Sequence, residues 1–175
     1  DSYDGGIHTP AAIRWPGVLA AGVTSNQYVW VGDFFPTLAA ATGVTPQNTK
    51  PMDGLNLWPA LQSISASNPN GSARPSPLVT GASAPVAIQT YTDPVSGGAK
   101  VFKIIRNKSG TTVSNELFNM TDDPYETTDL LLGANAASYS AIVTALTSAI
   151  TSITPESYPP YIGPAGITQS VSQAG

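Results

Sequence analysis

Three short segments with the composition of β-strands follow one another in the second half of the chain, and they constrain its fold most. Residues 84–91, 100–106 and 111–118 are rich in β-branched, aromatic or other apolar residues. The sequences between them contain Asp-Pro, Gly-Gly and Asn-Lys-Ser-Gly, which are typical of turns. Strands joined by such turns form hairpins. We therefore predict an antiparallel meander over these residues.

A helix is predicted to follow the third strand. Apolar residues recur there at the spacing of one helix face: Ile142, Leu146, Ala149 or Ile150, and Ile153. No charged residue occurs between Asp129 and Glu156, and many Ser and Thr residues lower the helix propensity. The helix must therefore be stabilised by docking on the sheet. Residues 155–175 are rich in proline and are expected to form an extended tail.

The first half of the chain shows a second, less regular pattern. Residues 34–42 are predicted to form a helix, with Asp33 as its N-cap and Gly43 as its C-cap. Residues 11–15 have the pattern of a strand that ends at the Pro16-Gly17 turn. Residues 44–77 contain many Pro, Asn, Ser and Gly residues and are predicted to form a long surface loop.

The segment YDGGIHTPAAIRWPG, residues 3–17, contains the only histidine of the chain. Its two glycines predict a tight turn, which Ile7 and His8 leave in extended conformation because Pro10 restricts the residue before it. We expect Asp4 to brace this turn through backbone N–H groups. Arg14 and Trp15 are interpreted as an edge charge and a core ring.

This segment and three later ones resemble the sulfatase family, in the order in which the family has them. Residues 3–17 are similar to its acidic, Gly-Gly, Arg or His and Trp-Pro-Gly pattern, and residues 31–38 to its Asp and Pro-Thr-Leu helix start. Residues 52–58 are similar to its Asp-Gly segment, and residues 116–126 to its Glu-Leu-Tyr-Asn and Asp-Pro-x-Glu pair. Each motif is weak alone, and their order makes the resemblance specific over residues 3–131.

The resemblance implies the C-terminal part of an α/β sulfatase fold. Residues 1–77 are then the end of the catalytic α/β domain, with the last strand and helix of its large mixed sheet and a long loop. Residues 78–154 are a small antiparallel sheet packed with a C-terminal helix, and residues 155–175 are the extended tail.

The resemblance also implies a chemistry that this chain cannot perform by itself. Sulfatases hydrolyse sulfate esters with a formylglycine made from Cys or Ser in Cys/Ser-x-Pro-x-Arg, beside a divalent cation. The chain has no cysteine, and its nearest serine version, residues 67–71, has Gly71 in place of the arginine. The formylglycine, calcium with its ligands, and a sulfate-contacting lysine are therefore expected in an N-terminal half upstream of Asp1. We expect no catalytic or metal-binding residue in this chain.

His8 is the one substrate-binding residue that the resemblance suggests. It occupies the position of the family's Arg or His beside the mouth of the active site, where a cation or donor could hold an anionic ester. A structural histidine in the turn is the alternative.

Two other clusters have a simpler interpretation than a functional one. Residues 81–85 resemble a nucleophile elbow, but proline replaces its last glycine and no second histidine is present. Asp122, Asp123 and Glu126 could be read as paired catalytic or calcium-binding carboxylates. A turn with Asx caps before Pro124 is the favoured interpretation.

Composition restricts the partners and the compartment. Only 10% of residues are charged, the net charge is −4, and there is no basic run, so nucleic acid is not an expected partner. No apolar run reaches the roughly 18 residues that cross a bilayer. The low charge favours a secreted or periplasmic protein. Sequons at Asn70, Asn107 and Asn119 leave glycosylation open.

We therefore predict the C-terminal part of a secreted, arylsulfatase-like sulfuric ester hydrolase, inactive by itself. Its partners are then the N-terminal half of the same enzyme or copies of itself, and it meets the sulfate ester only within the whole enzyme. The alternative is a non-catalytic extracellular assembly or surface-structure module of sulfatase ancestry. A carbohydrate-binding module has only scattered aromatic residues in its favour.

Overall fold

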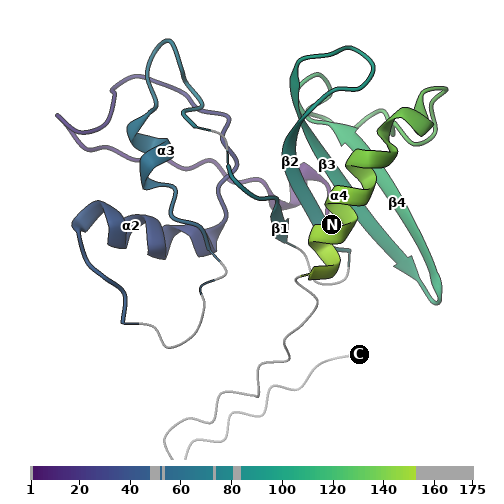
Figure 1. The fold of residues 1–175 in the computed structure, drawn as a ribbon, viewed down its shortest axis with the longest axis horizontal. Helices are drawn as coiled ribbons and strands as arrows, with labels where there is room; N and C mark the ends of the chain where they lie inside the picture. The colour runs from purple at the N-terminus through teal and green to yellow at the C-terminus, as the bar shows by residue number, and fades with distance from the viewer. Residues whose placement is uncertain (1, 48–51, 53, 73, 81–83, 153–175) are drawn as a thin grey trace, which may run out of the picture.

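The computed structural model describes residues 2–47, 52, 54–72, 74–80 and 84–152 (Figure 1). An antiparallel sheet covered by a helix forms one side of the molecule, and two shorter helices joined by irregular segments form the other. The predicted tail, residues 155–175, and the serine of the elbow-like segment lie outside the described residues. In the part of the chain that is described, no helix has the length and apolar character needed to span a membrane.

The sheet confirms the predicted meander. Its four strands pair antiparallel in chain order: β1 (Leu78–Thr80), β2 (Val86–Thr92), β3 (Ala99–Ser109) and β4 (Thr112–Asn119). The last three strands lie within three residues of the predicted bounds. β1 was not predicted, because three residues are too few to show a period.

Helix α4 (Ser140–Ser152) packs on one face of this sheet, as its apolar spacing predicted. A short 3₁₀ turn, η2 (Ala136–Tyr139), leads into it. The cluster between helix and sheet consists of buried side chains from both: Ala87, Phe102, Ile104, Leu117, Tyr139, Ile142, Leu146 and Ile150. Because the helix carries no charge of its own, this burial is what stabilises it.

The opposite face of the sheet carries a smaller apolar cluster and one lysine. Val86, Ile105, Phe118 and Met120 form the cluster. Lys103 alternates with Phe102 and Ile104 along β3 and therefore points to this second face. The N-terminal segment covers the lysine, and the ring of Tyr3 meets Phe118 edge to face, with 6.0 Å between ring centroids.

Helix α2 (Phe34–Thr42) has the predicted bounds and ends at Gly43, whose φ of 71° is the left-handed conformation of a C-cap. Asp33 occupies the predicted N-cap position, but its side chain makes no cap hydrogen bond to this helix. Its carboxylate instead accepts hydrogen bonds from the backbone N–H groups of Trp30 and Leu55 and is paired with Arg74. Asp33 thus holds η1 (Val31–Asp33) and two distant loops together.

Three expectations for the first half are corrected. Residues 11–15 form no strand and are exposed, because no strand in the described residues pairs with them. Trp15 is 39% exposed and packs against Trp58, with ring centroids 5.3 Å apart, so it is not a core ring. The predicted loop 44–77 contains a short helix, α3 (Trp58–Gln62). The expected last strand of a large mixed sheet is therefore absent from residues 11–15.

Candidate functional site

The segment around His8 forms a single helical turn, α1 (Asp4–Ile7). The backbone N–H of Gly6 donates to the carbonyl of Tyr3, and that of His8 donates to the carbonyl of Asp4. The predicted tight turn is present, but Ile7 belongs to it and neither glycine has a positive φ. His8 leaves the turn in extended conformation, as predicted, with φ −83° and ψ 124°.

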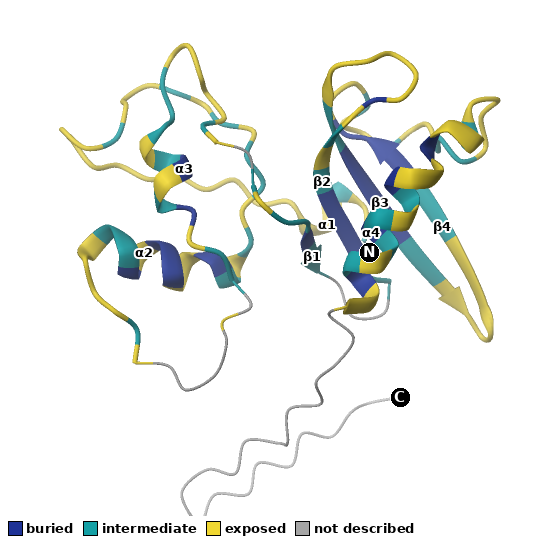
Figure 2. Ribbon diagram, viewed as in Figure 1, coloured by how far each residue is buried: buried dark blue, intermediate teal, exposed yellow. Residues whose placement is uncertain are grey.

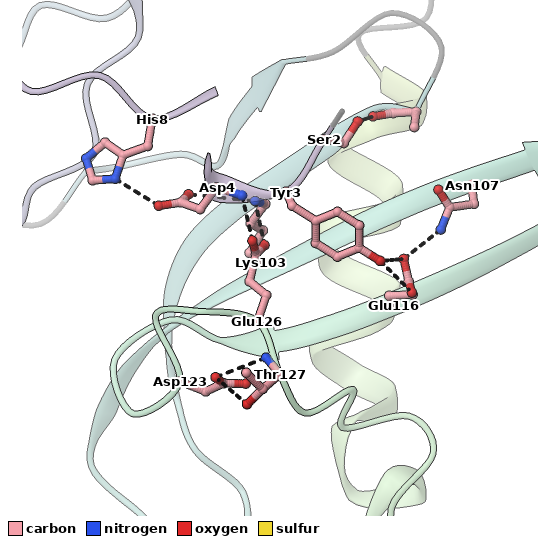
Figure 3. Close-up of polar contacts among 11 residues, drawn as sticks. Ser2, Tyr3, Asp4, His8, Lys103, Asn107, Glu116, Asp123, Glu126 and Thr127 are labelled. Carbon is pink, nitrogen blue, oxygen red and sulfur yellow. Dashed lines mark hydrogen bonds and ion pairs between the residues drawn. The ribbon is translucent and has the colours of Figure 1, made fainter. Parts of the chain in front are cut away.

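His8 is paired with Asp4. Its Nδ1 atom lies 2.8 Å from Asp4 Oδ2, and its side chain is 62% exposed (Figure 3). A carboxylate only accepts, so Nδ1 is the donor, and in the neutral ring Nε2 becomes an acceptor. The prediction that Asp4 braces the turn through backbone N–H groups is wrong, because its carboxylate faces the imidazole and Lys103.

Lys103 and Glu126 form a buried ion pair beneath this turn. Lys103 Nζ lies 2.6 Å from Glu126 Oε1 and 3.7 Å from Asp4 Oδ1, and the two paired side chains are 0% and 3% exposed. The backbone N–H of Asp4 donates to Glu126 Oε2 at 2.5 Å. Buried charges require such partners. The pair therefore fixes α1 on the sheet.

Sequence analysis missed the role of this ion pair. A lysine inside the apolar run Val-Phe-Lys-Ile-Ile is the signal that could have indicated a buried charge with a partner. The partner itself is 23 residues away in sequence (103 to 126), and no pattern predicts that it meets the N-terminal turn.

The carboxylates of the Asp-Asp-Pro-Tyr-Glu turn have separate partners. Asp123 accepts from the backbone N–H groups of Thr127 and Thr128, at 3.1 and 2.8 Å, which confirms the predicted turn with an Asx cap before Pro124. Burial by itself would raise the pKa of Asp123, but these hydrogen bonds hold that pKa below its usual value. Asp122 pairs with Lys100 at 2.7 Å. These carboxylates therefore shape a turn rather than converge on a common centre.

A groove of about 710 Å³ opens beside His8. The described residues that line it come from α1 and its C-cap, from the loops around residues 26 and 70, from β3 and from the turn after β4. They are Asp4, Gly5, His8, Asn26, Tyr28, Asn70, Val101, Met120, Thr121, Pro124 and Tyr125. Burial, followed by the charges of Asp4 and Glu126, raises the pKa of Tyr28 to about 12. The groove thus offers two phenols, of which that of Tyr28 is kept neutral by its raised pKa, together with amides, a hydroxyl, one imidazole and the carboxylate of Asp4.

The predicted sequons differ in their accessibility. Asn119 is buried and its Nδ2 donates to Asp122, whereas Asn107 Nδ2 donates to Glu116. Asn70 is exposed, lines the groove and accepts the backbone N–H of Asn26 through Oδ1. Of the three, only Asn70 has an amide nitrogen outside these hydrogen bonds.

Comparison with known proteins finds sulfatases over one part of the chain, whereas no protein-family model matches it. The N-acetylgalactosamine-6-sulfatase of Homo sapiens is 42% identical over 60 residues, which are 34% of this chain and 12% of that protein. Arylsulfatase H of Homo sapiens is 38% identical over 60 residues, 34% of this chain and 11% of that protein. The steryl-sulfatase of Rattus norvegicus is 34% identical over 61 residues, 35% of this chain and 11% of that protein.

These matches confirm the predicted resemblance. They cover about a third of the chain and about an eighth or less of each relative.

Proposed function

We propose that the chain is the C-terminal part of a secreted sulfuric ester hydrolase of arylsulfatase type. The basis is the similarity of about 60 of its residues to sulfatases. The motif order over residues 3–131 supports this proposal. So does the antiparallel sheet with its docked helix, which has the arrangement expected of the closing subdomain. The sequence similarity is the observation that carries it.

In this proposal the nucleophile and the metal belong to an N-terminal half. Calcium, when bound there, would stabilise the oxygens of the sulfate. Among the residues that the structure describes, no group of three or more His, Cys, Asp or Glu side chains could hold a metal ion. The described residues therefore do not fit a calcium site, and their part is to place His8 at the rim.

The exposed apolar side chains of the first half support a covering partner. Val31, Phe34, Phe35 and Leu38 are 71%, 46%, 57% and 51% exposed. Exposed apolar residues gathered in this way mark interaction surfaces. We propose that the N-terminal half of the enzyme covers them, and that copies of the chain do so when that half is absent.

An activity assay tests the proposal directly. The purified chain should leave an aryl sulfate unhydrolysed, with or without added calcium, because it lacks the covalent nucleophile. Joined to a segment that carries Cys/Ser-x-Pro-x-Arg and the acidic metal ligands, it should restore turnover. Calcium-dependent turnover by the chain alone, surviving repurification, would show that the nucleophile lies within it.

The non-catalytic assembly module remains the second candidate, and the exposed apolar surface is the observation that favours it. Light scattering coupled to size exclusion separates the two candidates. A hydrolase part should form a one-to-one complex with the N-terminal half. An assembly module should form polymers of itself even when that half is present.

His8→Ala in the complete enzyme tests the rim role. Because its side chain is 62% exposed, we expect kcat/KM to fall and the melting temperature to stay nearly unchanged. Arg14→Ala, an exposed change in the same segment, is the control and should affect neither. A large loss of melting temperature with unchanged kcat/KM would make His8 structural.

A further inference from the structure

Tyr125 is an aromatic side chain held in the solvent at the edge of the groove. It is 86% exposed, whereas the other tyrosine of the groove, Tyr28, is half-buried. When an exposed ring on a flexible loop binds a ligand, the loop and the side chain lose conformational entropy. The loss is smaller when the backbone of the loop is already fixed.

The turn that carries Tyr125 is held in place on both sides. Before the ring, Asp123 accepts hydrogen bonds from Thr127 and Thr128. After it, Glu126 has a φ of 55°, which non-glycine residues rarely adopt, and its carboxylate is buried against Lys103. Local strain of this kind persists where the surrounding structure fixes it, and it occurs preferentially at functional sites. The ion pair therefore positions Tyr125 as well as α1.

The charge of the groove is unsuited to an anion. Of the described residues that line it, none is Lys or Arg, and Asp4 contributes a carboxylate. The buried cation nearby, Lys103, already faces Glu126 and Asp4. In its neutral form His8 presents Nε2 as an acceptor, because Nδ1 donates to Asp4. These groups suit hydroxyl groups better than sulfate oxygens.

We propose that this groove binds an uncharged sugar ring, the neutral part of a carbohydrate ester, with Tyr125 stacking on its apolar face. Hydroxyls of the ring would meet His8 Nε2, the amide of Asn70 and the phenol of Tyr28. The volume of about 710 Å³ lies within the range of small-ligand sites and exceeds what a sulfate ion needs. The inference rests on the proposed function for the identity of the ester, but the sugar contact requires no hydrolysis.

Saturation-transfer NMR on the purified chain tests this inference with four probes. Methyl β-D-galactopyranoside and methyl β-D-glucopyranoside are the neutral sugars, and phenol and inorganic sulfate are the controls. The chain contains a single histidine, so its imidazole signals report on His8 alone. We expect transfer to the ring protons of at least one glycoside, together with a shift of the His8 signals.

Variants at Tyr125 decide whether the groove makes this contact. Tyr125→Ala should weaken the glycoside contact roughly tenfold, whereas Tyr125→Phe keeps the ring and should retain it. Leu132→Ala is the matched control, because Leu132 is 87% exposed and does not line the groove. The exposure of Tyr125 means that its removal leaves the fold intact, which the amide spectrum of the variant checks.

Three results would overturn the inference: no transfer to either glycoside, equal transfer in Tyr125→Ala, or a His8 shift with phenol or sulfate alone. A different result would overturn the proposed hydrolase function. A glycoside contact that depends on Tyr125, in a protein whose complete form hydrolyses no sulfate ester, would remove the hydrolase proposal and support the sugar site.

Discussion

The sheet region, residues 78–152, and the N-terminal region, residues 2–77, use their apolar residues in different ways. In the sheet region two buried clusters fill both faces of the sheet. In the N-terminal region the buried hydrophobic residues among those described are Ala39, Leu57 and Ala60, while larger ones are exposed (Figure 2). The sheet region therefore contains most of the buried apolar core among the described residues, whereas polar contacts such as those of Asp33 hold the N-terminal region together.

Among the described residues, a buried ion pair occurs in each region, and the two pairs have different roles. Asp33 and Arg74, 0% and 8% exposed, hold loops of the N-terminal region to one another. Lys103 and Glu126 hold α1 to the sheet. The second pair thus joins the two regions at the candidate site.

Breaking the Lys103 pair should have the largest effect. Lys103→Met leaves the carboxylates of Glu126 and Asp4 without their buried cation, and we expect a loss of about 3–5 kcal/mol in the free energy of unfolding. Urea unfolding measures it. Lys108→Met, at an exposed position of the same strand, is the control and should change stability by less than about 0.5 kcal/mol. Equal effects of the two variants would mean that the ion pair does not join the regions.

A matched pair of leucines tests the comparison of the two cores. Leu146, on α4, is fully buried against the sheet, and Leu38, on α2, is 51% exposed. Leu146→Ala should destabilise by about 2–5 kcal/mol because it leaves a cavity. Leu38→Ala should change the free energy of unfolding by less than about 1 kcal/mol and should reduce self-association. If Leu38→Ala proved as costly as Leu146→Ala, the N-terminal region would have a core of its own.

The same contrast explains which parts of the fold the sequence could predict. β2, β3, β4, α2 and α4 follow from local periodicity, turn residues and caps, and the structure confirms them. The strand expected over residues 11–15 failed because a strand forms only with a neighbour, which the described residues do not provide.

The candidate site was predictable only in part, for a related reason. His8 was found from its motif, and the Asx-capped turn at Asp123 from its neighbours in sequence. The pairing of Lys103 with Glu126 and Asp4 joins three separate segments. Such contacts depend on how the chain folds back on itself, so no local pattern indicates them. Asp33 was likewise placed correctly at the start of α2, whereas the pairing of its carboxylate with Arg74 and with the backbone N–H of Leu55 was not indicated.

Two glycines with positive φ allow the two regions to be perturbed separately. Gly43 ends α2 and Gly110 lies between β3 and β4, with φ of 71° and 59° and open space around both. Alanine at either position should therefore cost about 1 kcal/mol from backbone strain alone. If the regions unfold separately, hydrogen exchange should quicken near residue 43 in one variant and near residue 110 in the other. Identical exchange changes throughout the chain would show a single cooperative unit.

The smallest expected effect concerns acid, which should weaken the sheet region. Asp93 lies in the turn between β2 and β3, where burial alone raises its pKa, but hydrogen bonds from the backbone N–H groups of Val95 and Ser96 hold it below the usual value. A carboxyl whose pKa is lowered in the folded state contributes stability that is fully present above its unfolded pKa, about 3.9, and that is lost as the pH falls through the folded value. Asp123, in the same region, behaves alike.

Asp93→Asn removes one of these titrations and keeps the side-chain oxygen that accepts the two hydrogen bonds. The variant should be slightly less stable than the wild type at pH 6, and urea unfolding at a series of pH values should show a smaller loss between pH 5 and pH 2. Asp122→Asn is the control, because its carboxylate is exposed and pairs with Lys100 at the surface. Because the pKa values of Asp93 and Asp123 are lowered in the folded state, acid should weaken the sheet region in which both lie. If the wild type lost no more stability in acid than Asp93→Asn does, the Asp93 turn would not contribute to this loss.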